Sequence, residues 1–154
     1  MTNSPRPAIA IGADHAGYPL KLRVVAQLEA EGYPVHDLGT YGVERVDYPD
    51  YAAKVAAAVG SEAARFGILI CGTGIGMSIA ANRDKRIRCA LAHDAATARL
   101  ARAHNDANVL ALGARTTPED VALEAVRAFL NTDFEGGRHT TRVAKLGSRQ
   151  TERA

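Results

Sequence analysis

Residues 66–76 read Phe-Gly-Ile-Leu-Ile-Cys-Gly-Thr-Gly-Ile-Gly and join an apolar run to a glycine-rich loop. The run from Phe66 to Cys71 is almost wholly apolar, which is typical of a parallel strand with helices on both faces. Three alternating glycines then let successive backbone N–H groups turn toward an anion. A helix that begins within the loop adds its positive end. The stretch therefore predicts a central strand of an α/β sheet with an anion-binding loop at its carboxyl end.

The position of Cys71, between the strand and the loop, makes it a candidate for chemistry. The same loop field that attracts an anion favours a thiolate, so Cys71 can serve as a base or nucleophile near neutral pH. Without the glycines, a buried and inert cysteine would be the ordinary interpretation. Cys89 has no glycine loop beside it, and we expect it to be inert.

Three better-known loops do not fit this stretch. The dinucleotide fingerprint requires a glycine at position 77 or 79, where the chain has Met77 and Ile79. The Walker A loop ends in Gly-Lys-Ser/Thr, which is missing here. A tyrosine-phosphatase loop places an arginine six positions after its cysteine, and that position is Met77. The arginine that would hold the phosphoryl group during its transfer to Cys71 is therefore missing.

Outside this stretch, apolar runs of strand length alternate with helical patterns. We expect strands at 8–13, 33–38, 66–71, 88–92 and 108–112, and helices at about 20–32, 49–60, after Gly74, 94–103 and 118–130. Five such alternations predict an α/β protein of the three-layer α/β/α, Rossmann-like class, with a five-stranded and mostly parallel sheet. The chain is expected to be one domain over 1–154, with a loose arm at 1–7 and a tail at about 146–154.

Several polar residues follow the expected strands directly. They are Asp14-His15, Cys71–Gly76, His93-Asp94 and Gly113–Arg115. Parallel α/β sheets bind ligands beyond the carboxyl ends of their strands, so this topology gathers these residues at one edge. After a Gly-Gly break, Arg138 and Arg142 are four residues apart and would share one side of a helix. That spacing suits a phosphate group, although a solvated helix face has the same pattern.

Composition limits the classes of partner. The 154 residues include 19 basic and 17 acidic side chains, a balance that does not suggest a nucleic-acid partner. The two cysteines both fall in expected strands, so no disulfide is indicated and a reducing cytoplasm fits best. The pattern predicts neither a signal peptide nor a membrane span.

Six motifs, in order and spacing, resemble the type B ribose-5-phosphate isomerases within the ribose and galactose phosphate isomerases. They are Gly12-Ala-Asp-His-Ala-Gly17, Asp47-Tyr-Pro49, Cys71-Gly-Thr-Gly-Ile-Gly76, Arg102-Ala-His-Asn-Asp106, Gly113-Ala-Arg115 and Glu135-Gly-Gly-Arg-His-Thr-Thr-Arg142. The resemblance covers about residues 8–145. It implies an aldose-ketose isomerase of the non-oxidative pentose phosphate pathway. Such an enzyme interconverts D-ribose 5-phosphate and D-ribulose 5-phosphate through an enediolate, without a metal or an organic cofactor.

The resemblance also implies roles for the glycine loop. Cys71 is the base that carries a proton between C2 and C1. The amides of Gly72, Thr73, Gly74, Ile75 and Gly76 form an oxyanion hole for the charge that develops during enolisation. The Thr73 hydroxyl assists opening of the sugar ring, or serves only in ordinary loop hydrogen bonding.

The remaining motifs resemble substrate-binding positions. His104 matches the histidine that opens the furanose ring, although a histidine at a helix end is often a C-terminal cap. Asp14 and His15 match contacts to the sugar hydroxyls and the phosphate; Asp14 alone would pass as a helix N-cap. The others are matched to substrate or phosphate contacts, and they are Asn105, Arg115, Arg138 and Arg142. The resemblance implies a homodimer, or a dimer of dimers, in which His104, Asn105 and Arg115 reach the partner's site.

Three histidines receive no catalytic role. His93 is expected at the sheet edge or pocket wall, and His36 and His139 at the surface or behind the substrate contacts. Allose 6-phosphate, galactose 6-phosphate or a tetrulose 4-phosphate are alternative substrates. Galactose-6-phosphate isomerases divide the motifs between unlike subunits, whereas this chain holds them together, which favours a homomeric enzyme. A sugar-phosphate-binding regulatory protein would need neither the base nor the histidine.

Overall fold

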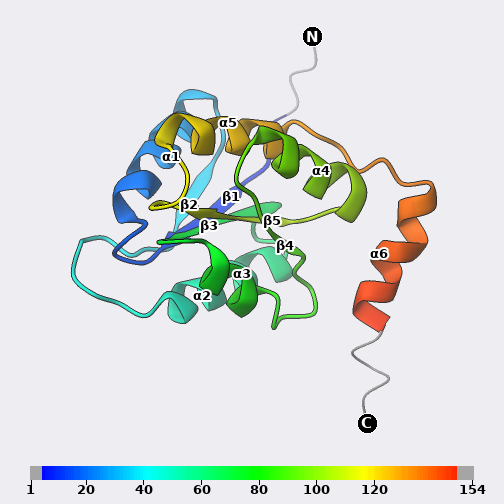
Figure 1. The fold of residues 1–154 in the computed structure, drawn as a ribbon, viewed down its shortest axis with the longest axis horizontal. Coiled ribbons are helices and arrows are strands. Elements are labelled where there is room, and N and C mark those ends of the chain that lie inside the picture. Colours follow the sequence, from blue (N-terminus) through cyan, green and yellow to red (C-terminus); the bar gives the residue numbers. More distant parts are fainter. Residues whose placement is uncertain (1–4, 149–154) are drawn as a thin grey trace.

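The computed structural model describes residues 5–148 as five strands and six helices in a three-layer arrangement (Figure 1). The strands are β1 (Ile9–Ala13), β2 (Val35–Asp37), β3 (Phe66–Cys71), β4 (Cys89–Leu91) and β5 (Val109–Gly113). The helices are α1 (Tyr18–Ala30), α2 (Tyr48–Gly60), α3 (Ile75–Ala81), α4 (Ala95–Asn105), α5 (Glu119–Leu130) and α6 (Arg138–Ser148). The expected alternation is confirmed, and the last segment after the Gly-Gly break is a helix.

All neighbouring strands pair in parallel, in the order β2-β1-β3-β5-β4. The edge strands β2 and β4 have three residues each, fewer than the sequence pattern predicted, and each has a neighbour on one side only. The central strand β3 pairs with β1 and β5, and Cys71 is opposite Gly113 at the carboxyl end. The glycine loop therefore leaves the middle of the sheet, between the loops that follow β1 and β5.

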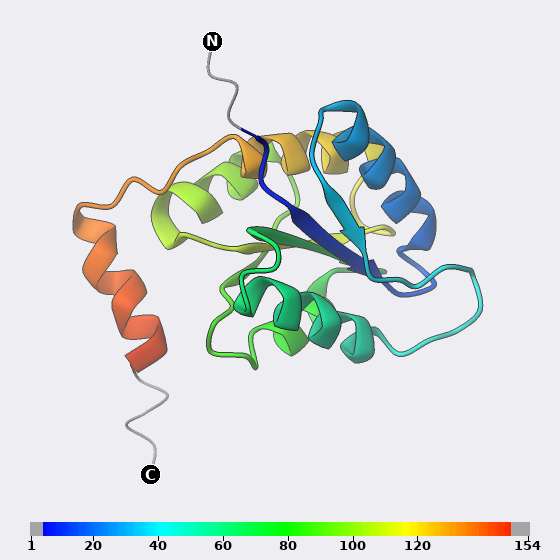
Figure 2. The same cartoon turned by 180° about the vertical axis from the view of Figure 1, so that it is seen from behind.

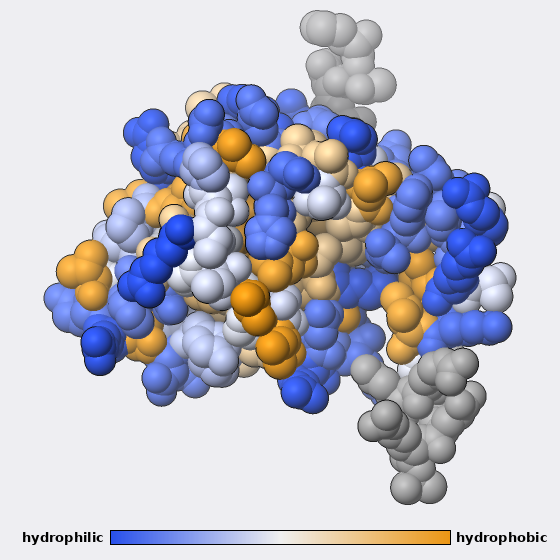
Figure 3. Space-filling model, viewed as in Figure 1, coloured by the Kyte–Doolittle hydropathy of each residue, from blue (hydrophilic) through white to orange (hydrophobic). Residues whose placement is uncertain are grey.

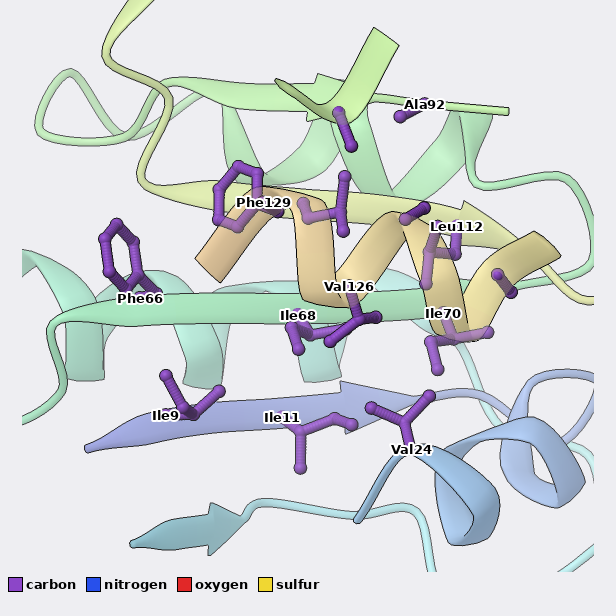
Figure 4. Packing of buried hydrophobic residues seen from close by; sticks show 14 of the residues in the cluster. Ile9, Ile11, Val24, Phe66, Ile68, Ile70, Ala92, Leu112, Val126 and Phe129 are labelled. Atoms are coloured by element: carbon purple, nitrogen blue, oxygen red, sulfur yellow. The ribbon is translucent and has the colours of Figure 1, made fainter. Parts of the chain in front are cut away.

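Both faces of the sheet are covered, which explains the apolar sequence of β3. Ile68 and Ile70 point into the cluster under α1, α4 and α5 (Figure 4). Leu69 and Cys71 point the other way, into the cluster under α2 and α3. Because side chains alternate along a strand, a run without polar positions is required when both faces are buried.

Helix α6 lies outside the three layers, beside α4 (Figures 1 and 2). The expected tail at 146–154 begins inside α6, and residues 149–154 fall outside the described part of the chain, as do residues 1–4 of the expected arm. In the described part of the arm, Arg6 donates a hydrogen bond to the Tyr33 hydroxyl, 2.9 Å away. Between residues 5 and 148, no helix has the length and apolar character that a membrane crossing requires.

Candidate active site

The loop after β3 is bonded to the loop after β5. The backbone N–H of Ala114 donates to the Cys71 carbonyl at 2.8 Å, and that of Arg115 donates to the Gly72 carbonyl at 2.9 Å. A Cβ on Gly113 would lie 2.6 Å from the Thr73 carbonyl oxygen, so only glycine permits this approach. These contacts hold the glycine loop at the carboxyl edge of the sheet.

The Cys71 thiol accepts a hydrogen bond inside its own loop. It is 5% exposed, and the Gly74 N–H donates to its Sγ at 3.2 Å. Gly74 has a φ of +78°, and a Cβ there would lie 2.9 Å from the backbone carbonyl carbon of Leu112. The left-handed backbone and the close packing both require glycine. An N–H directed at sulfur holds the Cys71 side chain in place beside the other loop amides.

Two of the five expected oxyanion-hole amides already have acceptors in the loop. The Gly74 N–H is directed at Cys71, and the Ile75 N–H donates to the Thr73 Oγ1 at 3.2 Å. The hydroxyl oxygen of Thr73 therefore makes the ordinary loop bond. Its O–H hydrogen can still be donated, since the hydroxyl is both donor and acceptor and Thr73 is exposed.

Asp14 and His15 follow β1 at the same edge. Asp14 is 7% exposed, and its Oδ1 accepts the Gly17 N–H at 3.0 Å, so its carboxylate caps the turn before α1. Within residues 5–148, nothing donates a hydrogen bond to its Oδ2. His15 Nδ1 accepts the Val46 N–H at 3.3 Å. The neutral imidazole then carries its hydrogen on Nε2, where it can be donated to a phosphate oxygen.

The loop that carries Val46 is anchored by a buried lysine. Lys21 is fully buried on α1, and its Nζ donates to Asp37 Oδ1 and to the Thr40 carbonyl, both at 2.6 Å. A buried ammonium requires such partners, because an unpaired charge there is costly. Lys21 thereby fixes the segment from Asp37 to Val46 at its first residues, and the Val46 N–H at the other end donates to His15.

Arg115 lies at the same carboxyl edge. A Cβ on Gly72 would be 3.3 Å from Arg115 Nη1, so the guanidinium lies beside the first residue of the glycine loop in the same chain. We name the set Asp14, His15, Cys71–Gly76 and Arg115 the cysteine half-site. His93 is exposed at the end of β4, as expected for a sheet edge. The adjacent Asp94 is a helix cap: the Thr97 N–H and hydroxyl lower the pKa of its carboxyl.

His104 and Asn105 lie at the opposite edge. Helix α4 runs antiparallel to the strands, and its last turn ends where β5 begins. Arg102, 3% exposed, donates to Asp106 Oδ1 at 2.9 Å and to the Thr132 carbonyl at 3.1 Å. These bonds fix the end of α4 and the segment leading to α6. Arg102 and Asp106, the first and last residues of the histidine motif, are therefore structural.

His139 is packed against His104. The two imidazoles stack with centroids 4.3 Å apart and planes 15° apart, and His139 is only 6% exposed. Burial lowers the pKa of His139, and the charge of Arg138 lowers it further. His36, by contrast, is exposed. The exposed Arg138 and Arg142 lie on α6, which packs beside the α4 helix that carries His104. We name the set His104, Asn105, Arg138 and Arg142 the histidine half-site.

The two half-sites of one chain cannot act on the same sugar. Strand β5 spans about 13 Å from Val109 to Gly113, which is the separation of the two edges. They also lie on opposite faces, because Cys71 packs toward α2 and α3 whereas α4 covers the other cluster. An acid or base must come within about 3 Å of the proton that it transfers. The structure thus separates the candidate residues into two groups.

Sequence comparison assigns this chain to a family. A profile described as Ribose/Galactose Isomerase matches residues 9–146. The chain belongs to that family. Ribose-5-phosphate isomerase B of Escherichia coli K12 is 48% identical over 138 residues, covering 90% of this chain and 93% of that protein.

Solved structures of ribose-5-phosphate isomerases share the fold. The Clostridium thermocellum ribose-5-phosphate isomerase B gives a TM-score of 0.93 at 50% identity, over 96% of this chain and 99% of that one. The Mycoplasma genitalium enzyme, solved with bound ribulose-5-phosphate, gives 0.90 at 41% identity, over 94% and 97%. The resemblance and the Rossmann-like fold inferred from the sequence are confirmed.

Three residues of this ribose/galactose isomerase lie at the two half-sites although the motifs predicted no role for them: Tyr48, Glu135 and His139. Tyr48 lies over the glycine loop: a Cβ on Gly76 would be 2.5 Å from its ring. Glu135 Oε1 lies 3.9 Å from His104 Nε2 and 3.6 Å from His139 Nε2. The available signals were the Tyr-Pro that opens α2 and the spacing of four between Glu135 and His139.

Proposed function

We propose that this isomerase interconverts D-ribose 5-phosphate and D-ribulose 5-phosphate, in the non-oxidative pentose phosphate pathway. The observation that carries the proposal is the Cys71 thiol, which is held by the Gly74 N–H at the mouth of a glycine loop in a chain of this family. A positioned base beside backbone donors is what enolisation of a carbonyl sugar requires.

The reaction begins with the closed sugar. His104 transfers a proton to or from the ring oxygen and the anomeric hydroxyl, and the Thr73 hydroxyl assists, so that the C1 aldehyde forms. Asp14 Oδ2 accepts a sugar hydroxyl. The phosphate is held by His15 Nε2–H and by the guanidinium groups of Arg138 and Arg142, because arginine pairs well with phosphate oxygens.

Proton transfer follows at the open chain. The Cys71 thiolate removes the C2 proton, the C–H electron pair becomes the C1–C2 double bond, and O1 takes the negative charge. Loop amides that are not already bonded stabilise this oxyanion. A proton then moves from the O2 hydroxyl to O1, and the thiol returns the first proton to C1. C1 thereby becomes the hydroxymethyl carbon and C2 becomes the ketone. No electrons leave the sugar, so this chemistry requires no redox cofactor.

The separated half-sites are the reason to include a second copy of the chain. We infer a homodimer, closed by a two-fold axis, in which the cysteine half-site of each chain meets the histidine half-site of the other. The sequence resemblance places Arg115 with His104 and Asn105 as a residue that reaches the partner's site. Because its guanidinium lies beside Gly72 of its own chain, we assign it instead to the cysteine side of the shared site. Asn105 accompanies His104 from the partner side.

Exposed apolar surface next to each half-site supports this pairing. Ile75 and Ile79 on α3 are 51% and 53% exposed and share one side of the helix. Figure 3 shows hydrophobic side chains over α3 and on the side of α6 turned to the body. A cleft of about 380 Å³ lies between the exposed Leu146 of α6 and β4, beside Asn105. A second copy covering both surfaces brings the two half-sites together.

Substrate comparison tests the proposed function. We expect kcat/KM for ribose 5-phosphate to exceed those for allose 6-phosphate and erythrulose 4-phosphate, with a chelator present throughout. Cys71→Ala should reduce turnover about 10²- to 10⁴-fold while substrate binding persists, since loss of a general base has that magnitude. Preference for another sugar phosphate would mean that the proposed substrate is wrong, while the isomerase mechanism would still hold. Turnover on none of them would favour a sugar-phosphate-binding protein.

A further inference from the structure

A cluster of three potential metal ligands lies where α4 meets α6. It contains His104 from the last turn of α4, Glu135 from the connecting segment and His139 from the first turn of α6. Their ligand atoms all lie within 4.8 Å of one another. Two imidazole nitrogens and one carboxylate oxygen form the ligand set of many open zinc sites.

The backbone is shaped to bring these residues together. Gly136 and Gly137 both have positive φ, +68° and +56°, a conformation that favours glycine. This turn places Glu135 and His139 on one side, toward His104. The Glu135 N–H also donates to the Ala103 carbonyl at 3.0 Å, which ties the turn to the end of α4.

The buried nitrogen of His139 lacks a hydrogen-bond partner. His139 is only 6% exposed, and its Nε2 makes no hydrogen bond within residues 5–148. Glu135 Oε1 is 3.6 Å from this nitrogen, too far for a good hydrogen bond. A buried polar atom without a partner is costly and requires an explanation, such as an ion.

The distances are close to those of a zinc site. Bonds of about 2.1 Å at tetrahedral angles place neighbouring ligand atoms about 3.4 Å apart. Glu135 Oε1 lies 3.6 Å from His139 Nε2 and 3.9 Å from His104 Nε2. These two distances exceed the ideal value by a few tenths of an ångström, and all three ligand atoms lie within 4.8 Å of one another. The side chains of His104 and Glu135 are 38% and 57% exposed, so they are free to move toward an ion. The nearly parallel rings must also rotate by some tens of degrees, because each imidazole ligates through a lone pair in its own ring plane and both lone pairs must meet at one ion.

We propose that His104, Glu135 and His139 bind a divalent transition-metal ion of the zinc class, with a fourth position open to solvent. Imidazole ligands select such ions over Mg²⁺ and Ca²⁺, which prefer oxygen. Arg138 and Arg142 lie close to His139 and oppose the charge of the ion, and Glu135 offsets part of that charge. The site is inhibitory, because an ion on His104 prevents it from exchanging protons with the sugar ring. This consequence, unlike the binding itself, rests on the proposed function.

Direct binding tests the site without reference to activity. The probe is Zn²⁺ in equilibrium dialysis against the untagged full-length Cys71→Ala protein, in which the loop thiol cannot compete. We expect the Cys71→Ala protein to bind one zinc per chain. Adding His139→Gln to that protein should lower its zinc affinity at least tenfold. His36→Gln, at an exposed histidine, is the matched control and should bind as before. If His139→Gln fails to fold, Glu135→Gln at an exposed position serves instead.

Inhibition provides the second readout. Zn²⁺ should inhibit the wild-type isomerase reversibly, a chelator should restore activity, and His139→Gln should require at least tenfold more Zn²⁺. Sub-stoichiometric binding by the Cys71→Ala protein would overturn the site. So would undiminished zinc affinity after His139→Gln or Glu135→Gln is added to it. Unchanged inhibition of His139→Gln would place the inhibitory ion elsewhere and overturn the proposed consequence. Stoichiometric zinc binding by a protein inactive on ribose 5-phosphate would instead refute the proposed function and leave the metal site standing.

Discussion

Mixing two inactive variants should restore activity if the site is shared between chains. The first variant, Cys71→Ala, lacks the base, and the second, His104→Asn, lacks the ring-opening group. Within one chain these residues lie about 13 Å apart along the sheet and on opposite faces. A heterodimer therefore has one site with both defects and one site with neither.

The expected recovery follows from this geometry. Random pairing of equal amounts makes half of the dimers heterodimers, and each has one intact site of two. Activity on ribose 5-phosphate should reach about a quarter of the wild-type value, against a residual of about 10⁻² to 10⁻⁴ for either variant alone. A site built within one chain would give no recovery at any ratio.

The assay is formation of ribulose 5-phosphate after co-refolding, with the heterodimer fraction measured by native mass spectrometry. The control pairs Cys71→Ala with the double variant Cys71→Ala/His104→Asn, which has no intact combination and should stay inactive. Heterodimers present without recovered activity would refute the shared site. Recovery well above a quarter would refute the assignment of one cysteine and one histidine to each site.

Three further outcomes test other parts of the argument. Ile79→Lys should raise the dimer dissociation constant about 30- to 1000-fold, since each of two symmetric contacts loses about 1–2 kcal/mol; unchanged sedimentation would exclude α3 from the interface. Burial raises the pKa of Cys89 to about 12, so at pH 8 only about one thiol in 10⁴ is ionised; rapid alkylation of native Cys89, followed by peptide mass mapping, would contradict this. Lys21→Met should lower the urea-derived unfolding free energy by about 2–4 kcal/mol, whereas Lys54→Met, at an exposed position, should change it by less than about 0.5 kcal/mol; equal effects would mean that the Lys21 anchor is not stabilising.

Much of the cysteine half-site was predictable because it depends on local sequence. The apolar run of β3 ends at Cys71, and glycine at 72, 74 and 76 follows directly. Parallel topology then places Asp14 and Arg115 at the same edge. The occupied amides of Gly74 and Ile75 were not predictable, since loop hydrogen bonds depend on the fold of the turn.

The histidine half-site was harder to predict. A spacing of four does not reveal whether Arg138 and Arg142 face solvent or a ligand. The burial of His139 depends on where α6 docks on α4, which the Gly136-Gly137 turn and the Glu135 backbone bond determine. Its role beside His104 was therefore left open by the motif.

The sequence by itself determined the alternation of strands and helices, the parallel sheet and the chemistry offered by each motif. These follow from hydrophobic periodicity and from glycine's backbone freedom, which act over a few residues. Only the tertiary structure decided the strand order, the orphaned nitrogen of His139 and the separation of Cys71 from His104. Those features arise from packing between segments that are distant in the chain. The number of residues between two such segments does not determine how far apart they lie in space.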